Sequence, residues 1–178
     1  DGLTNNSTPT FTGTAEAGST VSLRSGTTVM GTATADSSGN WSITPGNPLP
    51  DGLNILTAIA SDVAGNVSAA SPSLSLEVDT QLPTVGINAV ALDNTINAIE
   101  RESGISLSGL TEPNLNLVVK LLNAVGGSVT STFTVTADLA GQWQLLVDSY
   151  DLVQLGADGN KQVQVTTTDL AGNSTTIS

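Results

Sequence analysis

Short stretches of alternating apolar and polar residues run along most of the chain. Residues 20–24 and 31–35 alternate in the first half, and residues 73–78 and 162–166 alternate further on. Val, Thr, Ile and Leu fill these stretches, and Gly, Asn, Asp and Pro interrupt them about every 8–12 residues. A period of two is typical of a strand with one face in a core. The pattern therefore predicts an all-β fold.

One stretch, residues 143–155, also fits a helical pattern. Its apolar residues are Leu145, Leu146, Val147, Leu152 and Val153. We predict a strand there, followed by an irregular or single-turn connection.

Each half of the chain has one tryptophan at the start of a predicted strand. Trp41 follows a Gly-Asn turn and Trp143 follows a Gly-Gln turn. Because aromatic residues make up only 3% of the chain, these two indoles would bury a large share of the aromatic area. We predict that both are core residues, and stacking on a carbohydrate is the alternative.

The chain contains two copies of one sequence unit. Four landmarks recur in the same order: Gly-x-x-Glu, Ala-Asp-x-x-Gly-x-Trp, Asp-Gly, and Asp-x-Ala-Gly-Asn. They begin at Gly13, Ala35, Asp51 and Asp62 in the first copy and at Gly109, Ala137, Asp158 and Asp169 in the second. Each copy is close in size to an immunoglobulin-like domain of ~100 residues. We therefore predict two tandem immunoglobulin-like Greek-key β-sandwiches, residues 1–80 and 81–178.

The two copies differ at their beginnings. The second opens with a strand pattern at residues 84–90, whereas the first shows none before Thr8. We therefore expect the opening strand of the first domain to be missing, which leaves part of its edge exposed or capped by a neighbour. Residues 78–84, called the linker below, separate the two copies.

The balance of charges excludes several kinds of partner. Sixteen Asp and Glu stand against four Lys and Arg, which gives a net charge of −12. Nucleic acids and anionic membrane surfaces need a basic face, so neither is expected. No apolar run approaches the roughly 18 residues of a membrane span, so membrane insertion is not expected. The chain has no Cys and no His, which removes thiolate and imidazole metal ligands, while the excess of carboxylates suits a divalent cation.

Threading the second copy onto the seven strands of a Greek-key sandwich brings several acidic residues to one end. The strands fall near residues 84–91, 104–110, 115–121, 129–137, 143–147 and 161–168, and the last begins near 174. The loops at the N-terminal end then hold Glu112, Asp138, and Asp169 with Asn173. The linker brings Asp79 to the same end, and Asp51 lies at the end of the first copy that faces the junction.

Carboxylates held this close repel one another unless a cation lies between them. Ca²⁺ takes about 6–8 oxygen ligands and tolerates irregular geometry, whereas Mg²⁺ demands octahedral order. We therefore expect calcium to be bound by Asp79, Glu112, Asp169, Asp138, Asn173 and Asp51. A matching but weaker site in the first copy would use Glu16, Asp36 and Asp62. Bound calcium would tie the linker to the loops and so turn a hinge into a strut.

Ordinary turn chemistry is the alternative, because Asp before Gly or Asn is typical of tight turns. For Asp36 and Asp138 the turn is the preferred interpretation. Glu is not a turn residue, and it recurs at the same place as Glu16 and Glu112. Calcium is therefore the preferred interpretation for Glu112, Asp169 and Asp79.

Several motifs resemble the bacterial immunoglobulin-like tandem repeats of giant adhesins. In the first copy they are the run at 8–21, Ala-Asp-x-x-Gly-Asn-Trp at 35–41, Ser-Asp-x-Ala-Gly-Asn at 61–66 and Val-Asp-Thr-x-x-Pro at 78–83. The second copy resembles a sister variant through residues 93–100 and 169–173. The resemblance implies a calcium-stiffened stalk on the bacterial cell surface, secreted by type I machinery and used in attachment and biofilm formation. It also implies interdomain calcium at Asp79, Glu112 and Asp169.

Two functions from different classes fit these features. The preferred one is a structural extender segment, a monomer whose partners are neighbouring repeats of the same chain and a host surface or biofilm matrix. The alternative is a module that binds a host glycan or protein through a sheet face or an end loop, which needs an exposed aromatic or apolar patch. An enzyme is not expected, because the carboxylates lie in turns of small sandwiches with no evident cleft.

Overall fold

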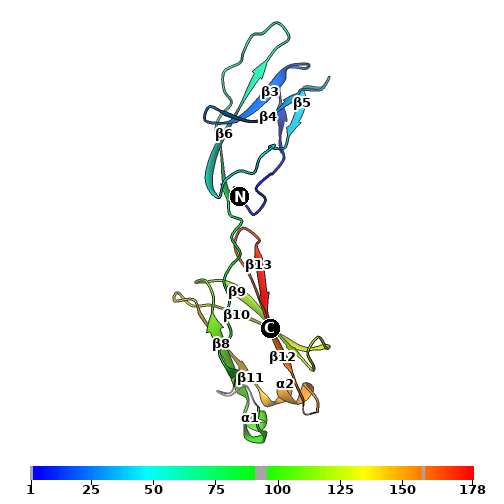
Figure 1. Cartoon of the computed structure of the whole chain (residues 1–178), viewed down its shortest axis with the longest axis vertical. Helices are drawn as coiled ribbons and strands as arrows, with labels where there is room; N and C mark the ends of the chain where they lie inside the picture. The colour runs from blue at the N-terminus through cyan, green and yellow to red at the C-terminus, as the bar shows by residue number, and fades with distance from the viewer. Residues whose placement is uncertain (1, 91–95, 158) are drawn as a thin grey trace. The chain divides into compact units, whose positions relative to one another are not determined.

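The computed structural model describes residues 2–90, 96–157 and 159–178. The chain divides into two compact units, Asp1–Gln81 (unit 1) and Leu82–Ser178 (unit 2), drawn in Figure 1. Asp158 and residues 93–95, which belong to the landmarks and motifs above, lie outside the described residues. Within the described ranges, no helix has the length and hydrophobicity needed to cross a membrane. Strands dominate both units, which confirms the all-β prediction.

Unit 1 is built from two sheets. Its strands are β1 (Leu3–Thr4), β2 (Phe11–Thr14), β3 (Thr20–Ser25), β4 (Thr28–Thr34), β5 (Asn40–Ile43), β6 (Gly52–Ser61) and β7 (Leu74–Val78). The larger sheet has the order β1-β7-β6-β3-β4, and the smaller one pairs β2 with β5. These pairs are antiparallel except for β1 and β7, which run parallel.

Strand β1 is a feature that the sequence does not predict, because no strand is expected before Thr8. Leu3 lies opposite Glu77 and Thr4 lies opposite Val78 in the parallel pair. The backbone N–H of Glu77 donates to the carbonyl oxygen of Gly2 at 2.7 Å. Two residues are too few to show a period of two, so the alternation could not reveal this strand.

Unit 2 has the same two-layer plan. Its strands are β8 (Ile105–Leu110), β9 (Asn116–Leu122), β10 (Val129–Thr136), β11 (Gln142–Val147), β12 (Gln162–Thr168) and β13 (Ser174–Ile177). The larger sheet has the order β10-β9-β12-β13, and the smaller one pairs β11 with β8. Residues 85–88 run along the edge of β8 that does not pair with β11, and Gly86 and Asn88 donate backbone hydrogen bonds to it. Strands β8 to β12 begin and end within about one residue of their predicted positions.

Two short helices interrupt the strands of unit 2, and they contact each other. Helix α1 (Ala98–Ser103) begins at Asn97, whose side chain and that of Glu100 form a capping box. Helix α2 (Ser149–Gln154) follows β11 directly and begins at Asp148. The predicted strand is confirmed as β11 (Gln142–Val147). The connection after it is a helix of six residues, longer than the irregular or single-turn connection that was expected. Helix α1 was not predicted.

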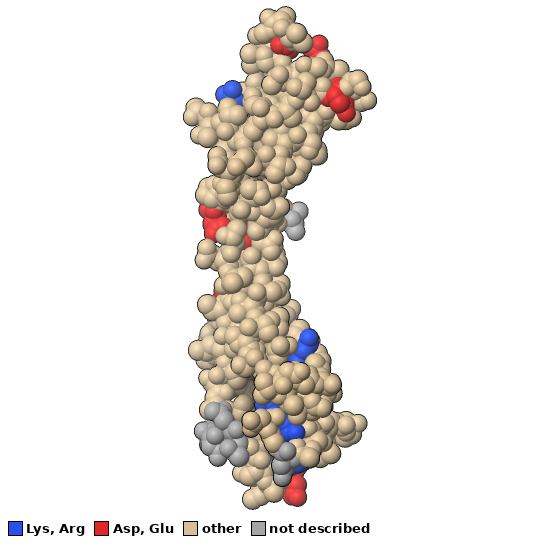
Figure 2. Space-filling view, turned by 45° about the vertical axis from the view of Figure 1, so that its right-hand side comes forward, with Lys and Arg blue, Asp and Glu red and all other residues tan. Residues whose placement is uncertain are grey.

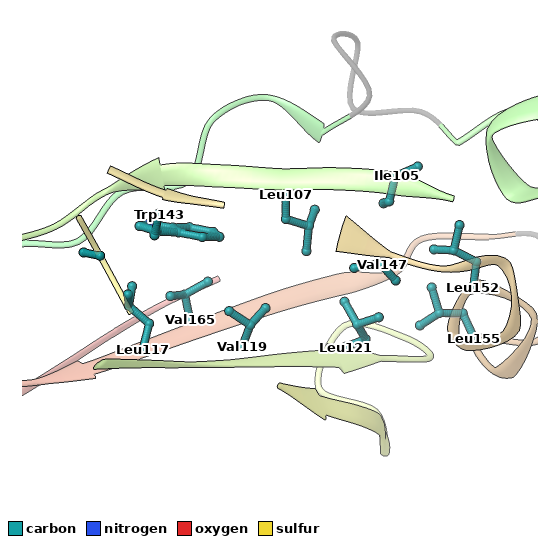
Figure 3. Packing of buried hydrophobic residues seen from close by; sticks show 11 residues of the cluster. Ile105, Leu107, Leu117, Val119, Leu121, Trp143, Val147, Leu152, Leu155 and Val165 are labelled. Atoms are coloured by element: carbon teal, nitrogen blue, oxygen red, sulfur yellow. The ribbon is translucent and has the colours of Figure 1, made fainter. Parts of the chain in front are cut away.

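The core of unit 2 lies between its two sheets. Trp143, at 2% exposure, packs with Leu117, Val119, Val147 and Val165, all fully buried. Figure 3 shows side chains of β8 and β11 facing those of β9 and β12. Each buried aliphatic side chain contributes about 1.5–3 kcal/mol. Trp143 is thus the core residue that the sequence predicts.

The core of unit 1 is smaller. It is formed by Phe11, Val21, Leu23, Ile43, Leu49, Leu56 and Val78. Trp41 packs against this cluster but is only partly buried. Both tryptophans therefore contact the core of their unit, but Trp41 is more exposed to solvent than Trp143.

Candidate metal-binding loops

Three loops of unit 2 lie at the end where the chain enters the unit. They are the β8–β9 loop (111–115), the β10–β11 loop (137–141) and the β12–β13 loop (169–173). The backbone N–H of Thr111 donates to the carbonyl of Gly141 at 2.8 Å, which joins the first two loops. Thr167 lies opposite Leu117 in the pair of β12 and β9, so the third loop leaves the sheet beside the first. This end therefore holds Glu112, Asp138, Asp169 and Asn173.

Residues at the end of the linker contact the β8–β9 loop. Val85 forms a β-bridge with Thr111, and Thr111 Oγ1 donates to the carbonyl of Thr84 at 2.7 Å. The backbone N–H of Thr84 donates to Glu112 Oε1 at 3.3 Å, which is long for such a bond. The carboxylate of Glu112 therefore lies against the chain as it enters unit 2. The sequence does not predict the roles of Thr84 and Thr111, because threonine is common in strands and does not by itself indicate a binding site.

Asp169 closes the β12–β13 hairpin with its own side chain. Its Oδ1 accepts hydrogen bonds from the backbone N–H groups of Gly172 (2.8 Å) and Asn173 (2.9 Å), and its Oδ2 accepts from Asn173 Nδ2 (2.8 Å). Partial burial raises the pKa of Asp169, but the hydrogen bonds from Asn173 and Gly172 outweigh it and hold the pKa below 3.8. Asp169 is thus ionised at neutral pH. An ionised carboxylate offers about four lone-pair positions, so these bonds leave it able to contact a cation.

Three further aspartates close turns in a similar way. Asp62 Oδ1 accepts from the backbone N–H of Asn66 (2.8 Å), and Oδ2 accepts from Asn66 Nδ2 (2.6 Å). Asp36 and Asp138 each accept from the backbone N–H four residues later, at 2.9 and 2.8 Å. Hydrogen bonds from Asn40 hold the pKa of Asp36 below 3.8, and those from Asn66 do the same for Asp62. Each of these side chains therefore has a structural role in its own turn.

Asp51 accepts hydrogen bonds from residues at the beginning of the linker, at the end of unit 1 opposite to Asp36 and Asp62. Its Oδ1 accepts from the backbone N–H of Thr80 (3.1 Å) and from Thr80 Oγ1 (2.9 Å), and its Oδ2 accepts from Gln81 Nε2 (2.9 Å). Hydrogen bonds from Gln81 and Thr80 hold the pKa of Asp51 below 3.8. Asp79 Oδ1 accepts from the backbone N–H of Gln81 (3.0 Å). The sequence does not predict the contacts of Thr80 and Gln81 with Asp51, because neither residue is part of a motif typical of metal-binding sites.

Two of the three corresponding loops of unit 1, the β2–β3 loop and the loop after β6, line one hollow. The backbone N–H of Ala15 donates to the carbonyl of Gly39 at 2.8 Å, which joins the β2–β3 and β4–β5 loops. Glu16 and Asp62 line a hollow of about 460 Å³ together with Trp41, and Asp36 does not line it. The structure therefore brings Glu16 and Asp62 to one place without Asp36.

The acidic side chains do not gather into a ready-made metal cage. Among the residues that the structure describes, no three Asp or Glu side chains lie close enough together to hold a metal ion. On the face shown in Figure 2, the Asp and Glu residues form small patches on a mostly uncharged surface. The donors are oxygens, which fit Ca²⁺, whereas Zn²⁺ in proteins takes mainly Cys and His. Because Ca²⁺ takes about 6–8 oxygens, a bound ion would also need backbone carbonyls, asparagine side chains or water.

Comparison with known proteins gives one family match and two informative structures. The model of the bacterial Ig-like domain family matches residues 1–80. A solved Ca²⁺-stabilized adhesin that helps an Antarctic bacterium reach out and bind ice is 29% identical, with a TM-score of 0.52, over 99% of this chain and 46% of its own. A structure of a 1.5-MDa bacterial ice-binding adhesin, concerned with host cell surface retention, is 30% identical, with a TM-score of 0.51, over 97% of this chain and 55% of its own. No curated protein sequence matches the chain.

These similarities confirm the resemblance to bacterial immunoglobulin-like repeats of large adhesins. The family match falls on the first copy, and the two structures are similar over both copies. The chain spans about half the length of the two adhesin structures, 46% of one and 55% of the other.

Proposed function

We propose that this chain is a structural extender segment of a bacterial surface adhesin, stiffened by calcium bound at the linker. The main structural support is that Glu112 lies against the linker residue Thr84, in a loop that neighbours the one closed by Asp169. The identity of 29% to a Ca²⁺-stabilized adhesin adds support over both copies. The proposed role is mechanical and involves no catalysis.

The same similarities support a proposal for the location and the partners of this chain. The chain is part of an extracellular protein of the bacterial cell surface, in line with the adhesins that it resembles. Its direct partners are then neighbouring immunoglobulin-like repeats of the same chain. A host surface or biofilm matrix is the partner of the whole adhesin.

Glu112 and Asp169 are the proposed calcium ligands of unit 2, and Asp79 is the proposed ligand from the linker. Glu112 accepts one long hydrogen bond, from Thr84, which leaves most of its lone pairs for a cation. Asp169 is ionised at neutral pH as any ordinary aspartate is, and its hydrogen bonds keep its pKa lowered despite partial burial. The supporting oxygens would come from Asp138, Asn173 and Asp51. A weaker site in unit 1 would use Glu16 and Asp62, which line one hollow, without Asp36.

The proposed mechanism is the neutralisation of like charges. Calcium supplies two positive charges and shared coordination to oxygens from separate segments. Without it, the carboxylates repel one another, and a short linker allows the domains to swing. Extracellular modules bind calcium weakly, with a dissociation constant on the order of 10⁻⁴–10⁻³ M, so the stiffening should respond to millimolar calcium.

Calorimetric unfolding of the full chain with and without calcium tests this proposal. Calcium should raise the melting temperature of unit 2 in the unmodified chain. The double variant Glu112→Gln, Asp169→Asn should lose that increase and still fold, because both changes preserve size. Glu102→Gln on helix α1 removes one carboxylate away from the loops and should keep the full response. An equal response in the double variant and in the control would reject these ligands.

A further inference from the structure

Strand β2 of unit 1 has an open edge. Among the described residues it pairs with β5 alone. The backbone N–H of Ala15 donates to Gly39 on the β5 side. Successive residues of a strand point their backbone groups to opposite sides, so those of Thr12 and Thr14 face away from β5. Two adjacent backbone sites on this edge are therefore available to another strand.

The matching strand of unit 2, β8, is paired on both edges. One edge pairs with β11. On the other, Gly86 N donates to the carbonyl of Leu110 at 2.7 Å, and Asn88 N donates to the carbonyl of Ser108 at 2.8 Å. Unit 2 thus shows what an occupied edge of this sandwich looks like.

The repeated Gly-x-x-Glu landmark aligns the two edges. It equates Gly13 with Gly109, and hence Thr14 with Leu110 and Thr12 with Ser108. A side chain at Gly109 would collide with the carbonyl of the covering strand. In unit 1 a Cβ at Gly13 would meet the ring of Trp41, as one at Gly109 would meet the indole nitrogen of Trp143, so both glycines leave room for their tryptophan.

The two tryptophans differ in solvent exposure and in the hydrogen bonding of the indole N–H, and a covering strand accounts for both differences. Trp143 is 2% exposed, and its Nε1 donates to the carbonyl of Gly86 at 3.2 Å. Trp41 is only partly buried, and the described residues of unit 1 provide no such acceptor. The indole N–H of Trp41 therefore lacks the backbone carbonyl that Gly86 supplies in unit 2.

A hollow of about 460 Å³ adjoins this open edge. Its lining includes Thr14, Trp41, Ala58, Ala60 and Ser68, so small side chains leave room for larger ones. In unit 2, Val85 and Ile87 of the covering strand pack against the core. The hollow in unit 1 is where two such aliphatic side chains would enter. Glu16 and Asp62 also line it, which disfavours an acidic occupant.

We propose that the open edge of β2, Trp41 and this hollow form an acceptor groove for one extended β-strand. The occupant is a polypeptide strand with the chemistry of residues 84–90: it is uncharged, has aliphatic residues two apart, and has glycine between them. Its backbone N–H groups bond the carbonyls of Thr12 and Thr14, and one of its carbonyls accepts from Trp41 Nε1. A second copy of this chain is a poor donor, because its residues 85–88 are already paired with β8.

Nuclear magnetic resonance of the full chain tests the groove directly, because the chain has only two tryptophans and therefore two indole N–H signals. The probe is a synthetic peptide with the sequence of residues 82–90. The control peptide carries proline in place of both Gly86 and Asn88, so it lacks the two backbone donors. EDTA is present throughout, which separates this test from any effect of calcium.

The expected result is a saturable shift of the Trp41 indole signal with the first peptide, no shift with the control peptide, and an unchanged Trp143 signal. Trp41→Phe retains an aromatic ring without the N–H donor and should weaken binding severalfold, followed through the backbone amide signals of Thr12 and Thr14 because the indole signal is lost. An unmoved Trp41 signal at millimolar peptide would overturn the proposal, as would equal shifts with both peptides or a shift confined to Trp143. A Trp41 signal that depends on protein concentration without peptide would assign the groove to a second copy and also overturn it.

Discussion

Replacing each tryptophan by alanine measures what the covering strand contributes to stability. Trp143 is 2% exposed, and a core Trp→Ala substitution costs about 3–5 kcal/mol. Trp143→Ala also leaves the carbonyl of Gly86 without the indole donor, which adds about 1 kcal/mol. A domain has only about 5–15 kcal/mol in total, so unit 2 should come close to unfolding. Trp41→Ala removes a partly exposed ring without that hydrogen bond, and unit 1 should lose at least about 1 kcal/mol less.

Hydrogen exchange followed by mass spectrometry is the suitable assay, because it measures the opening of each unit separately. A single melting curve of a two-unit chain does not give one defined free energy of unfolding. Trp143→Ala should abolish most of the slow exchange in β8, β9 and β12 and leave unit 1 unchanged. Trp41→Ala should lower protection in β2 and β5 by a smaller factor. An equal or larger loss in Trp41→Ala would refute the role given to the strand at residues 85–88.

Three further predictions concern local structure. Asn97→Ala should destabilise unit 2 by about 1 kcal/mol because it removes the cap of α1, and Asn97→Ser should restore most of the melting temperature. Gly104→Ala should lower the melting temperature of unit 2, because Gly104 has a φ of 86° and a Cβ there would lie 2.7 Å from a backbone oxygen of β11. Gly46→Ala in unit 1, where a Cβ meets open space, should leave the melting temperature of unit 1 unchanged. Hydrogen bonds from Gln81 and Thr80 lower the pKa of Asp51 in the folded state. The stabilisation from these bonds should therefore be complete above about pH 4, the pKa of an unfolded Asp, and be lost as the pH falls through the lower pKa of the folded state. The amide signal of Thr80 should report this loss, and Asp51→Asn should remove the pH dependence.

Most of the fold could be predicted because its signals are local. Alternation marks strands, and the repeated landmarks place the same strands in both copies, so β8 to β12 were predicted closely. The capping box of Asn97 and Glu100 is a local signal for the start of α1, but the helix is too short to show the apolar stripe that would mark its length. Strand β1 left no signal, because its pairing with β7 depends on backbone contacts between distant residues.

The candidate loops could be placed from topology, and their detailed contacts could not. A Greek-key order is enough to bring Glu112, Asp138 and Asp169 to one end of a sandwich. The partners of these side chains depend on turn geometry, which decides that Asp169 bonds Asn173 and that Asp51 bonds Thr80. Such contacts involve common residue types, so composition and spacing do not distinguish them.

Small-angle X-ray scattering of the full chain, with millimolar calcium and with EDTA, tests the proposed strut most directly. The proposal predicts a longer maximum dimension and a larger radius of gyration with calcium, because the linker stops bending. The double variant Glu112→Gln, Asp169→Asn should give the EDTA curve in both conditions. Superimposable curves for the unmodified chain with and without calcium would contradict a calcium-stiffened extender.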